Sequence, residues 1–385
     1  MSLDDDVRAE LGELARTGRL RIPRVVDGVP GPTIVLDGIP VLNFASNDYL
    51  SLAGDRRLVR AATVALEEDG VGAGASRLIT GNHRRHTALE RAISDWMNCD
   101  GVRLFNTGYA ANVGVLTTLL GPDDIVYSDA LNHASIVDGC RLSRAKIVVF
   151  PHRDLAALEV ALAKGGGRRR VVVSETLFSM DGDFADLEAL STLCARHDAS
   201  LILDEAHALG VLGPQGRGLA AAVGRRPDVL IGTLGKAVGT FGAFAVTSRA
   251  IADLLWNRAR TFVFSTGMPP NIAAASRAAI EIVRSSEGEE RRQALARNAR
   301  RLRELVPMAG GMPDSPIAPI VVGDDRAVMQ LSARLFERRV FVQGIRPPTV
   351  PVGSARLRVS INARHEDHHI ETISQSVLDA VRHVD

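Results

Sequence analysis

Between residues 102 and 246, short apolar runs alternate with stretches of helical period, and this alternation constrains the fold more than any other feature. The apolar runs are 102–105, 125–127, 147–150, 171–174, 201–204, 229–231 and 243–246. Helical stretches such as 154–164 and 186–197 separate most of them. Short apolar strands that alternate with helices form a mainly parallel sheet covered on both faces. The sequence therefore predicts an α/β fold built on a mainly parallel sheet with helices on both faces.

The two flanking regions show different patterns. Residues 3–18 have the period of an amphipathic helix, and strands at 34–36 and 41–44 flank Asp37-Gly38, which is a hairpin signal. Residues 285–306 have a polar helical period, and "SSEGEERRQ" is interpreted as a linker that enters this helix. Strands at 317–322, 340–342 and 356–361 then alternate with helices. We expect an N-terminal segment (1–45), a large domain (46–284) and a small α+β domain (285–385).

Composition excludes several classes of function. The chain has 385 residues, a formal net charge of +1 and only 4% aromatic residues. Nucleic-acid and membrane binding are therefore not expected, and no apolar run approaches the ~20 residues of a membrane span. The start "MSLDDD" is acidic, unlike a signal peptide. Cys99, Cys140 and Cys194 are odd in number and widely spaced, which favours a reduced cytoplasmic protein with neither disulfides nor a zinc site.

Polar residues follow four of the expected strands. Ligands bind beyond the carboxyl ends of the strands in open α/β sheets. At the first end, the free N–H groups of Gly108 and Tyr109 open a helix, which favours a phosphate seat. The second end reads Ser174-Glu175 and leads to Ser179. Each of these features also occurs in ordinary turns.

The third and fourth ends carry residues that can act on protons. Asp204 ends a buried strand and His207 lies three positions later, although an Asp at such a place is also a common helix cap. The fourth end contains Thr233 and Lys236. The chain has only three lysines among its 46 basic residues. A lysine can lose its proton and act as a nucleophile, whereas an arginine stays charged.

Residues 204–207 spell the DEAH box of some helicases, which raises a rival interpretation. A nucleoside triphosphatase would need a G-x-x-x-x-G-K-[ST] loop upstream of this box. The one Gly-Lys pair, Gly235-Lys236, lies downstream, and Ala237 stands where the hydroxyl should be. This alternative is therefore disfavoured.

The four strand ends together suit one cofactor. They supply a phosphate seat, a carboxylate for a ring cation, an imidazole and an amine. Pyridoxal 5′-phosphate needs these four partners, because its aldehyde bonds a lysine amine and its pyridinium nitrogen needs a carboxylate.

Eight ordered motifs, running from about Leu20 to the C-terminus, resemble the α-oxoamine synthases, which are fold-type I pyridoxal-phosphate enzymes. The motifs are "NFASNDYLSLAG", "GVGAGASRLITGNHRRHTALE", "DALNHASIVDG", "SETLFSMDGD", "DEAHALGVLGPQGRG", "TLGKAVGTFGAF", "FSTGMPP" and "IRPPTVPVGSARLR".

The resemblance implies a role for each matched residue. Catalytic roles fall to Lys236, which carries the cofactor and moves a proton, and to Asp204, His207 and His133. The cofactor and its phosphate are contacted by Gly108, Tyr109, Glu175, Ser179, Thr233, Ser265 and Thr266. Asn47 and Arg346 are expected to meet the amino-acid carboxylate, His133 to orient the substrate, and Arg21 and Thr349 to bind the acyl substrate. No metal ligand is implied.

The resemblance also implies a seven-stranded sheet of the aspartate aminotransferase-like kind, and it implies the reaction. "IRPPTVP" is most similar to members that condense L-alanine with a pimeloyl thioester and release CO₂, in biotin biosynthesis. The thioester is carried on coenzyme A or on an acyl carrier protein. A homodimer is expected, with Ser265 and Thr266 reaching the phosphate of the neighbouring subunit. The close alternative is a family member that uses glycine, of the 2-amino-3-ketobutyrate ligase type.

Overall fold

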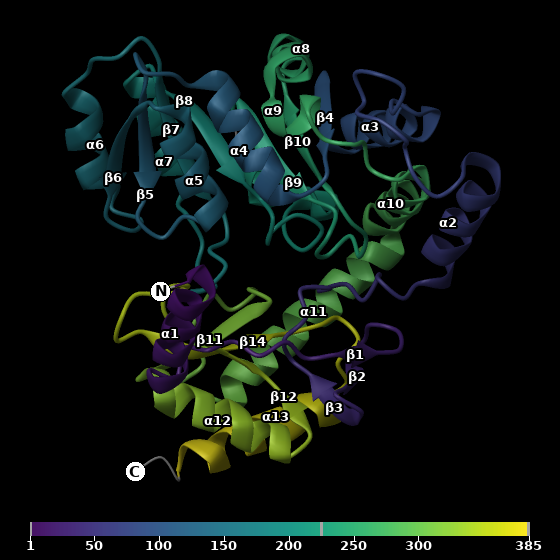
Figure 1. Ribbon diagram of the computed structural model, residues 1–385, viewed down its shortest axis with the longest axis vertical. Helices are drawn as coiled ribbons and strands as arrows, with labels where there is room; N and C mark the ends of the chain where they lie inside the picture. The colour runs from purple at the N-terminus through teal and green to yellow at the C-terminus, as the bar shows by residue number, and fades with distance from the viewer. Residues whose placement is uncertain (1, 224–225, 383–385) are drawn as a thin grey trace. The chain divides into compact units, whose positions relative to one another are not determined.

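The computed structural model describes residues 2–223 and 226–382, which fall into two compact units. The large unit consists of Leu50–Ser179 and Asp183–Gln293, and the terminal unit of Met1–Tyr49, Met180–Gly182 and Ala294–Asp385. The residues expected to form an N-terminal segment and a separate C-terminal domain therefore belong to one unit. In Figure 1 this unit carries both the purple and the yellow ends of the colour scale.

A seven-stranded sheet forms the centre of the large unit, as the alternating pattern predicts. Its strand order is β4-β10-β9-β8-β7-β5-β6. β10 runs antiparallel to both of its neighbours, and the other pairings are parallel. The strands are β4 (Gly101–Phe105), β5 (Ile125–Asp129), β6 (Lys146–Phe150), β7 (Arg170–Glu175), β8 (Ser200–Asp204), β9 (Val229–Thr233) and β10 (Ala243–Thr247).

The middle strands of this sheet are buried on both faces, which explains their unbroken apolar runs. All residues of β5 and β9 are buried, and so are the residues of β8 after Ser200. Helices of the large unit cover the sheet (Figure 1). They are α2 (Arg56–Asp69), α3 (Arg84–Met97), α4 (Gly108–Leu119), α5 (Ala134–Ser143), α6 (Leu155–Ala163), α7 (Leu187–Arg196), α8 (Arg249–Arg258), α9 (Arg260–Val263) and α10 (Pro270–Val283), with short 3₁₀ turns η1 (Pro214–Gly216) and η2 (Leu219–Ala222).

One hydrophobic core lies between the sheet and α4. It combines Val115 and Leu116 of α4 with Val173, Ile202 and Ile231 from three strands. Burial of such side chains contributes roughly 1.5–3 kcal/mol each. The sheet is therefore a rigid support for the loops that follow its strands.

The terminal unit contains two small sheets. Their orders are β1-β2-β3-β12 and β11-β14-β13. The strands are β1 (Val26–Asp27), β2 (Thr33–Leu36), β3 (Ile39–Asn43), β11 (Ile317–Gly323), β12 (Val340–Phe341), β13 (Gln343–Ile345) and β14 (Ala355–Ser360), and the helices are α1 (Leu3–Arg16), α12 (Asp325–Glu337) and α13 (Asp367–Val381). The predicted hairpin at Asp37-Gly38 is confirmed as β2 and β3.

The helix α11 (Ser286–Leu305) contains the unit boundary between Gln293 and Ala294. The prediction that "SSEGEERRQ" forms a linker is wrong, because the helix already begins at Ser286. Glu287 accepts hydrogen bonds from Arg291 one turn later and ion-pairs with Arg57, which stabilises this polar first turn. Among the residues described, no helix is both long and apolar enough to cross a bilayer.

Candidate functional site

Lys236 and His207 meet beyond the carboxyl ends of β9 and β8. The Nζ atom of Lys236 lies 2.7 Å from Nε2 of His207. Lys236 sits in a tight loop, in which its carbonyl accepts the N–H of Gly239 and the hydroxyl of Thr233 accepts the N–H of Gly235. A hydrogen bond between an amine and an imidazole requires one of the two to lack a proton. This contact is therefore suited to proton transfer.

Asp204 ends β8 as a buried carboxylate with two donors. Its Oδ2 accepts from Nδ2 of Asn112 at 2.7 Å, and its Oδ1 accepts from the N–H of Ala206 at 2.8 Å. Asn112 also donates to the hydroxyl of Ser135, so its position is fixed. A buried carboxylate that is bonded to neutral donors can stabilise a cation brought to it.

Glu175, at the end of β7, carries its proton at neutral pH. Burial and then the charge of Asp204 raise the pKa of Glu175 to about 8, against the opposing effects of Lys236 and of hydrogen bonds from the backbone N–H groups of His133 and Ser179. Its buried Oε1 has no hydrogen-bond partner among the described residues. Glu175 is therefore a neutral neighbour of Asp204.

His133 caps the N-terminus of α5. Its Nδ1 accepts the N–H of Ser135 and lies 2.8 Å from the hydroxyl of the same residue. More than a third of His133 is exposed, yet the surrounding protein desolvates its ring enough to lower the pKa, with Asp204 acting in the opposite direction. A neutral imidazole with an open face is suited to stack on a flat ring.

The start of α4 offers free backbone donors. Thr107 is the N-cap, and its hydroxyl accepts the N–H of Ala110. The N–H groups of Gly108 and Tyr109 come before the first intrahelical bond, and no described residue accepts them. A Cβ atom at Gly108 would meet nothing within 4 Å, so the approach to these donors is open. The predicted phosphate seat has the local geometry that an anion needs.

The remaining predicted cofactor residues also belong to the large unit. Ser179 and Thr233 are buried, and the hydroxyl of Thr233 donates to the carbonyl of Gly242. Ser265 and Thr266 follow α9, and the carbonyl of Thr266 accepts from Asn106 at the end of β4. Together with the amine, the buried acid pair and the open α4 terminus, these groups fit pyridoxal 5′-phosphate, because each of its functional groups finds a matching partner.

Apart from His133, which belongs to the large unit, the predicted substrate residues lie in the terminal unit, in two groups. Nη2 of Arg21 lies 3.5 Å from the hydroxyl of Thr349. Nearby, the buried Arg346 donates to the carbonyl of Leu20 and to Sδ of Met329. Burial and then the charge of Arg21 lower the pKa of Arg346, and its Nε has no partner among the described residues. Arg21, Arg346 and Thr349 therefore form a cationic group without a bonded carboxylate.

Asn47 belongs to the second group, with a residue that the sequence analysis did not single out. Its Oδ1 accepts from Nη1 of Arg358 at 3.2 Å and from the hydroxyl of Tyr49 at 3.0 Å. Arg358 is only 6% exposed and also donates to the hydroxyl of Ser360. The sequence signal that could have identified Arg358 is an arginine placed between apolar residues of an expected strand.

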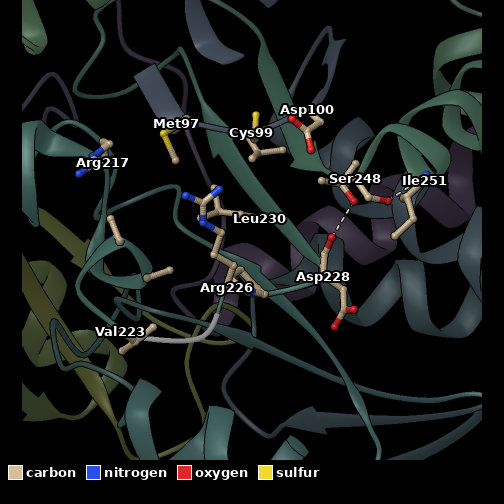
Figure 2. Close-up of a pocket in the computed structure, with 15 residues that line it drawn as sticks. Met97, Cys99, Asp100, Arg217, Val223, Arg226, Asp228, Leu230, Ser248 and Ile251 are labelled. Carbon is tan, nitrogen blue, oxygen red and sulfur yellow. Dashed lines mark hydrogen bonds between the residues drawn. The ribbon is translucent and has the colours of Figure 1, made fainter. Parts of the chain in front are cut away.

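A further cavity of the large unit, of about 330 Å³, contains none of these residues among its described lining (Figure 2). Met97, Cys99, Asp228 and Ser248 line it, at the start of β9 and the end of β10. These are the sheet ends opposite to the one that carries Lys236.

Comparison with known proteins gives consistent matches over nearly the whole chain. The profile of the aminotransferase class I and II family matches residues 39–377. The 8-amino-7-oxononanoate synthases of Citrifermentans bemidjiense and Geobacter sulfurreducens are 48% and 45% identical, over 94% and 95% of both chains. Among solved structures, Sphingomonas wittichii serine palmitoyltransferase has a TM-score of 0.92 at 32% identity, covering 98% of this chain and 97% of that one. The 8-amino-7-oxononanoate synthase of Francisella tularensis has a TM-score of 0.77 at 27% identity, covering 89% and 98%.

Proposed function

The chain belongs to the aminotransferase class I and II family, and from this membership and the site of the large unit we propose its reaction. It is a pyridoxal-phosphate-dependent acyltransferase that condenses L-alanine with a pimeloyl thioester, releasing CO₂ and a thiol and giving 8-amino-7-oxononanoate for biotin biosynthesis. The observation that carries the proposal is the contact between the Lys236 amine and His207 beside the buried Asp204. The similarity to 8-amino-7-oxononanoate synthases supplies the choice of substrates.

Each residue of the large unit has a task in this reaction. The bound cofactor supplies an electron sink for bonds broken at the alanine Cα. Asp204 would hold the positive charge of the ring nitrogen, and His133 would stack on the ring. Lys236 would hold the cofactor aldehyde, and its free amine would accept the Cα proton at Nζ. His207, 2.7 Å from that amine, would orient it and bond the ring oxygen. Gly108, Tyr109, Ser179 and Thr233 would bind the phosphate, and Glu175 would stay neutral nearby.

The terminal unit supplies the cations for two carboxylates. Alanine brings one, and the far end of a pimeloyl chain brings another. We assign the alanine carboxylate to Asn47 and Arg358, because these two side chains are hydrogen-bonded to each other. Arg346, expected from the resemblance to share that role, is grouped with Arg21 and Thr349, which supports a role with the acyl substrate.

A homodimer completes the proposed site. Val71, Ile79 and Phe264 are each more than 70% exposed. Exposed large apolar side chains that gather on one surface often mark a protein interface. Val71 and Ile79 lie on either side of the glycine-rich segment 72–76. An isolated β-bridge joins this segment to Thr266 through Ser76. If a second copy of the chain covers these residues, Ser265 and Thr266 of one subunit would reach the cofactor phosphate bound by the other subunit. The free thiols of Cys99, Cys140 and Cys194 agree with a cytoplasmic location.

Absorption spectroscopy tests the cofactor. The purified protein should absorb visible light, and borohydride should bleach it and fix the cofactor on Lys236. The Lys236→Ala variant should bind cofactor without a reducible bond. A protein whose spectrum ignores added pyridoxal 5′-phosphate would overturn the proposal, and would reopen the DEAH-type triphosphatase interpretation.

A spectral titration then tests the amino acid. L-alanine should perturb the cofactor spectrum at lower concentration than glycine or L-serine, and product should form from alanine with a pimeloyl thioester. If only glycine responds in the presence of acyl-coenzyme A, the enzyme is the glycine-using alternative. Parallel assays with pimeloyl-coenzyme A and pimeloyl-carrier protein identify the physiological donor.

A further inference from the structure

His152 follows β6 and lies between two carboxylates, that of Asp129, the last residue of β5, and that of Asp183, in the loop after β7. Its Nδ1 lies 2.9 Å from Oδ1 of Asp129, and its Nε2 lies 3.0 Å from Oδ2 of Asp183. A neutral imidazole has one N–H, so both contacts are hydrogen bonds only when the ring is protonated. Burial favours the neutral ring, but the bonds to Asp129 and Asp183 outweigh it and raise the pKa of His152 to about 9. The ring is therefore a cation at neutral pH.

Asp129 fixes the turn that presents His133. Its Oδ1 also accepts the N–H of Leu131 at 2.8 Å, and its Oδ2 accepts the N–H of Arg153 at 2.9 Å. The next residue, Asn132, donates to the carbonyl of Val173 and accepts the N–H of Glu175. His133 comes directly after Asn132, so its ring position depends on this turn.

Asp183 closes the loop that carries Ser179. Its carbonyl accepts the N–H of Phe178 at 3.0 Å, and its carboxylate also accepts from Nη1 of Arg153. The Phe178 ring packs edge-on against the His152 ring, with centroids 4.4 Å apart. Ser179 comes directly after the buried Phe178, so the same contacts limit its movement.

We propose that His152 is a positioning residue, whose imidazolium ties the Asp129 turn to the Asp183 loop and thereby holds His133 and Ser179 in place for the cofactor. This role rests on the proposed function, which makes His133 and Ser179 cofactor ligands. His152 acts through these two loops, by its bonds to Asp129 and Asp183. The linkage joins the ends of three neighbouring strands, β7, β5 and β6.

The test uses His152→Gln, which removes the cation and can bond one carboxylate at most. Hydrogen exchange of the backbone at 130–133 and 176–179, followed by mass spectrometry, should become about 10- to 100-fold faster, as expected for lost hydrogen bonds between charged groups. The dissociation constant for pyridoxal 5′-phosphate, measured by absorbance titration, should rise by about tenfold or more. His197→Gln is the matched control, because His197, at the end of α7, also faces a carboxylate, that of Glu159 on α6 at 3.7 Å, and within the described residues bonds neither of the two loops.

The exchange experiment separates this proposal from the proposed function. A wild-type protein that binds no cofactor would overturn the proposed function, while exchange at the two loops would still report on the link. Unchanged exchange and cofactor affinity in His152→Gln would overturn the positioning role. If His152→Gln does not fold, Asp183→Asn removes the charge at one end only, and wild-type exchange at 176–179 in that variant would overturn the role equally.

Discussion

The two units of this chain handle charge in opposite ways. The polar groups of the large unit that face one another, Lys236, His207, His133, Glu175 and Asp204, belong to types that can gain or lose a proton in a protein. The cations singled out in the terminal unit are arginines, which keep their charge. Proton transfer needs the first kind of group, and a lasting hold on a carboxylate needs the second.

Two buried arginines of the terminal unit, Arg358 and Arg346, make hydrogen bonds to neutral atoms. Arg358 bonds the amide of Asn47 and a hydroxyl, and Arg346 bonds a carbonyl and a thioether. Arg303 is held by backbone carbonyls, and burial lowers its pKa to about 10, so it too remains charged. A cation that is bonded to neutral atoms still attracts an incoming anion. A cation that is paired with a carboxylate attracts it less, because the carboxylate neutralises its charge.

Lys236→Arg is the strongest challenge to this contrast. The variant keeps the positive charge but cannot release a proton or bond an aldehyde, so activity should fall by at least about 1000-fold. Steady-state assays and borohydride trapping measure the loss, and Lys164→Arg on the surface after α6 serves as the control. Residual activity above about one tenth would mean that the large unit does not need a removable proton here.

Asp204→Asn should have the next largest effect. The neutral amide cannot stabilise a ring cation, and it would face the Nδ2 donor of Asn112 with less favourable charge. We expect kcat to fall by about 100- to 1000-fold, since electrostatic groups of this kind contribute on that scale. Asp204→Glu should recover part of the loss. Rates within threefold of wild type for Asp204→Asn would contradict the assignment.

Arg358→Lys and Arg346→Lys divide the terminal unit into its two proposed subsites. Lysine keeps the charge but loses the bidentate fork, so each change should raise one KM by about tenfold. Arg358→Lys should affect L-alanine, and Arg346→Lys the pimeloyl thioester, with smaller changes in kcat. The assignment fails if the two variants respond to the same substrate.

Glu175→Gln should give the smallest effect, visible in stability against pH. The folded protein keeps a proton on Glu175 up to about pH 8, whereas the unfolded chain releases it near the ordinary glutamate pKa of 4.5. A raised pKa stabilises the fold at low pH, and that contribution is lost as the pH rises towards 8. The glutamine stays neutral at every pH, so the variant does not lose this contribution. The melting temperature of the variant minus that of the wild type should therefore rise by about 5 °C between pH 5 and pH 8.5.

Thermal unfolding in matched buffers measures this difference. Glu188→Gln, an exposed change on α7, is the control and should show no such trend. A difference that stays constant with pH would mean that Glu175 is already ionised in the folded protein.

Much of the fold could be predicted because buried parallel strands leave unbroken apolar runs. The seven strands, and the polar residues that end four of them, follow from that pattern. The polar start of α11 was misread, since a charged helix start with Glu287 and Arg291 has the composition of a linker. Local composition does not distinguish the two when side chains pair one turn apart.

The less predictable residues are those whose role depends on distant partners. Arg358 is one of two arginines two positions apart on β14, a spacing that usually marks an exposed face, and yet both are buried. His152 is one of ten histidines, and its partners Asp129 and Asp183 lie 23 and 31 positions away. Only the three-dimensional arrangement identifies these partners.

The terminal unit is assembled from both ends of the chain, and this affects the order of events on the ribosome. β3 pairs with β2 early, but its other edge pairs with β12, nearly 300 residues later. The emerging chain must therefore carry an incomplete sheet while the whole large unit is translated and folds. Ribosome-bound fragments that end before residue 340 should expose this strand edge to chaperones. Attaching the first 49 residues after Asp385 would test whether the delay is tolerated or needed.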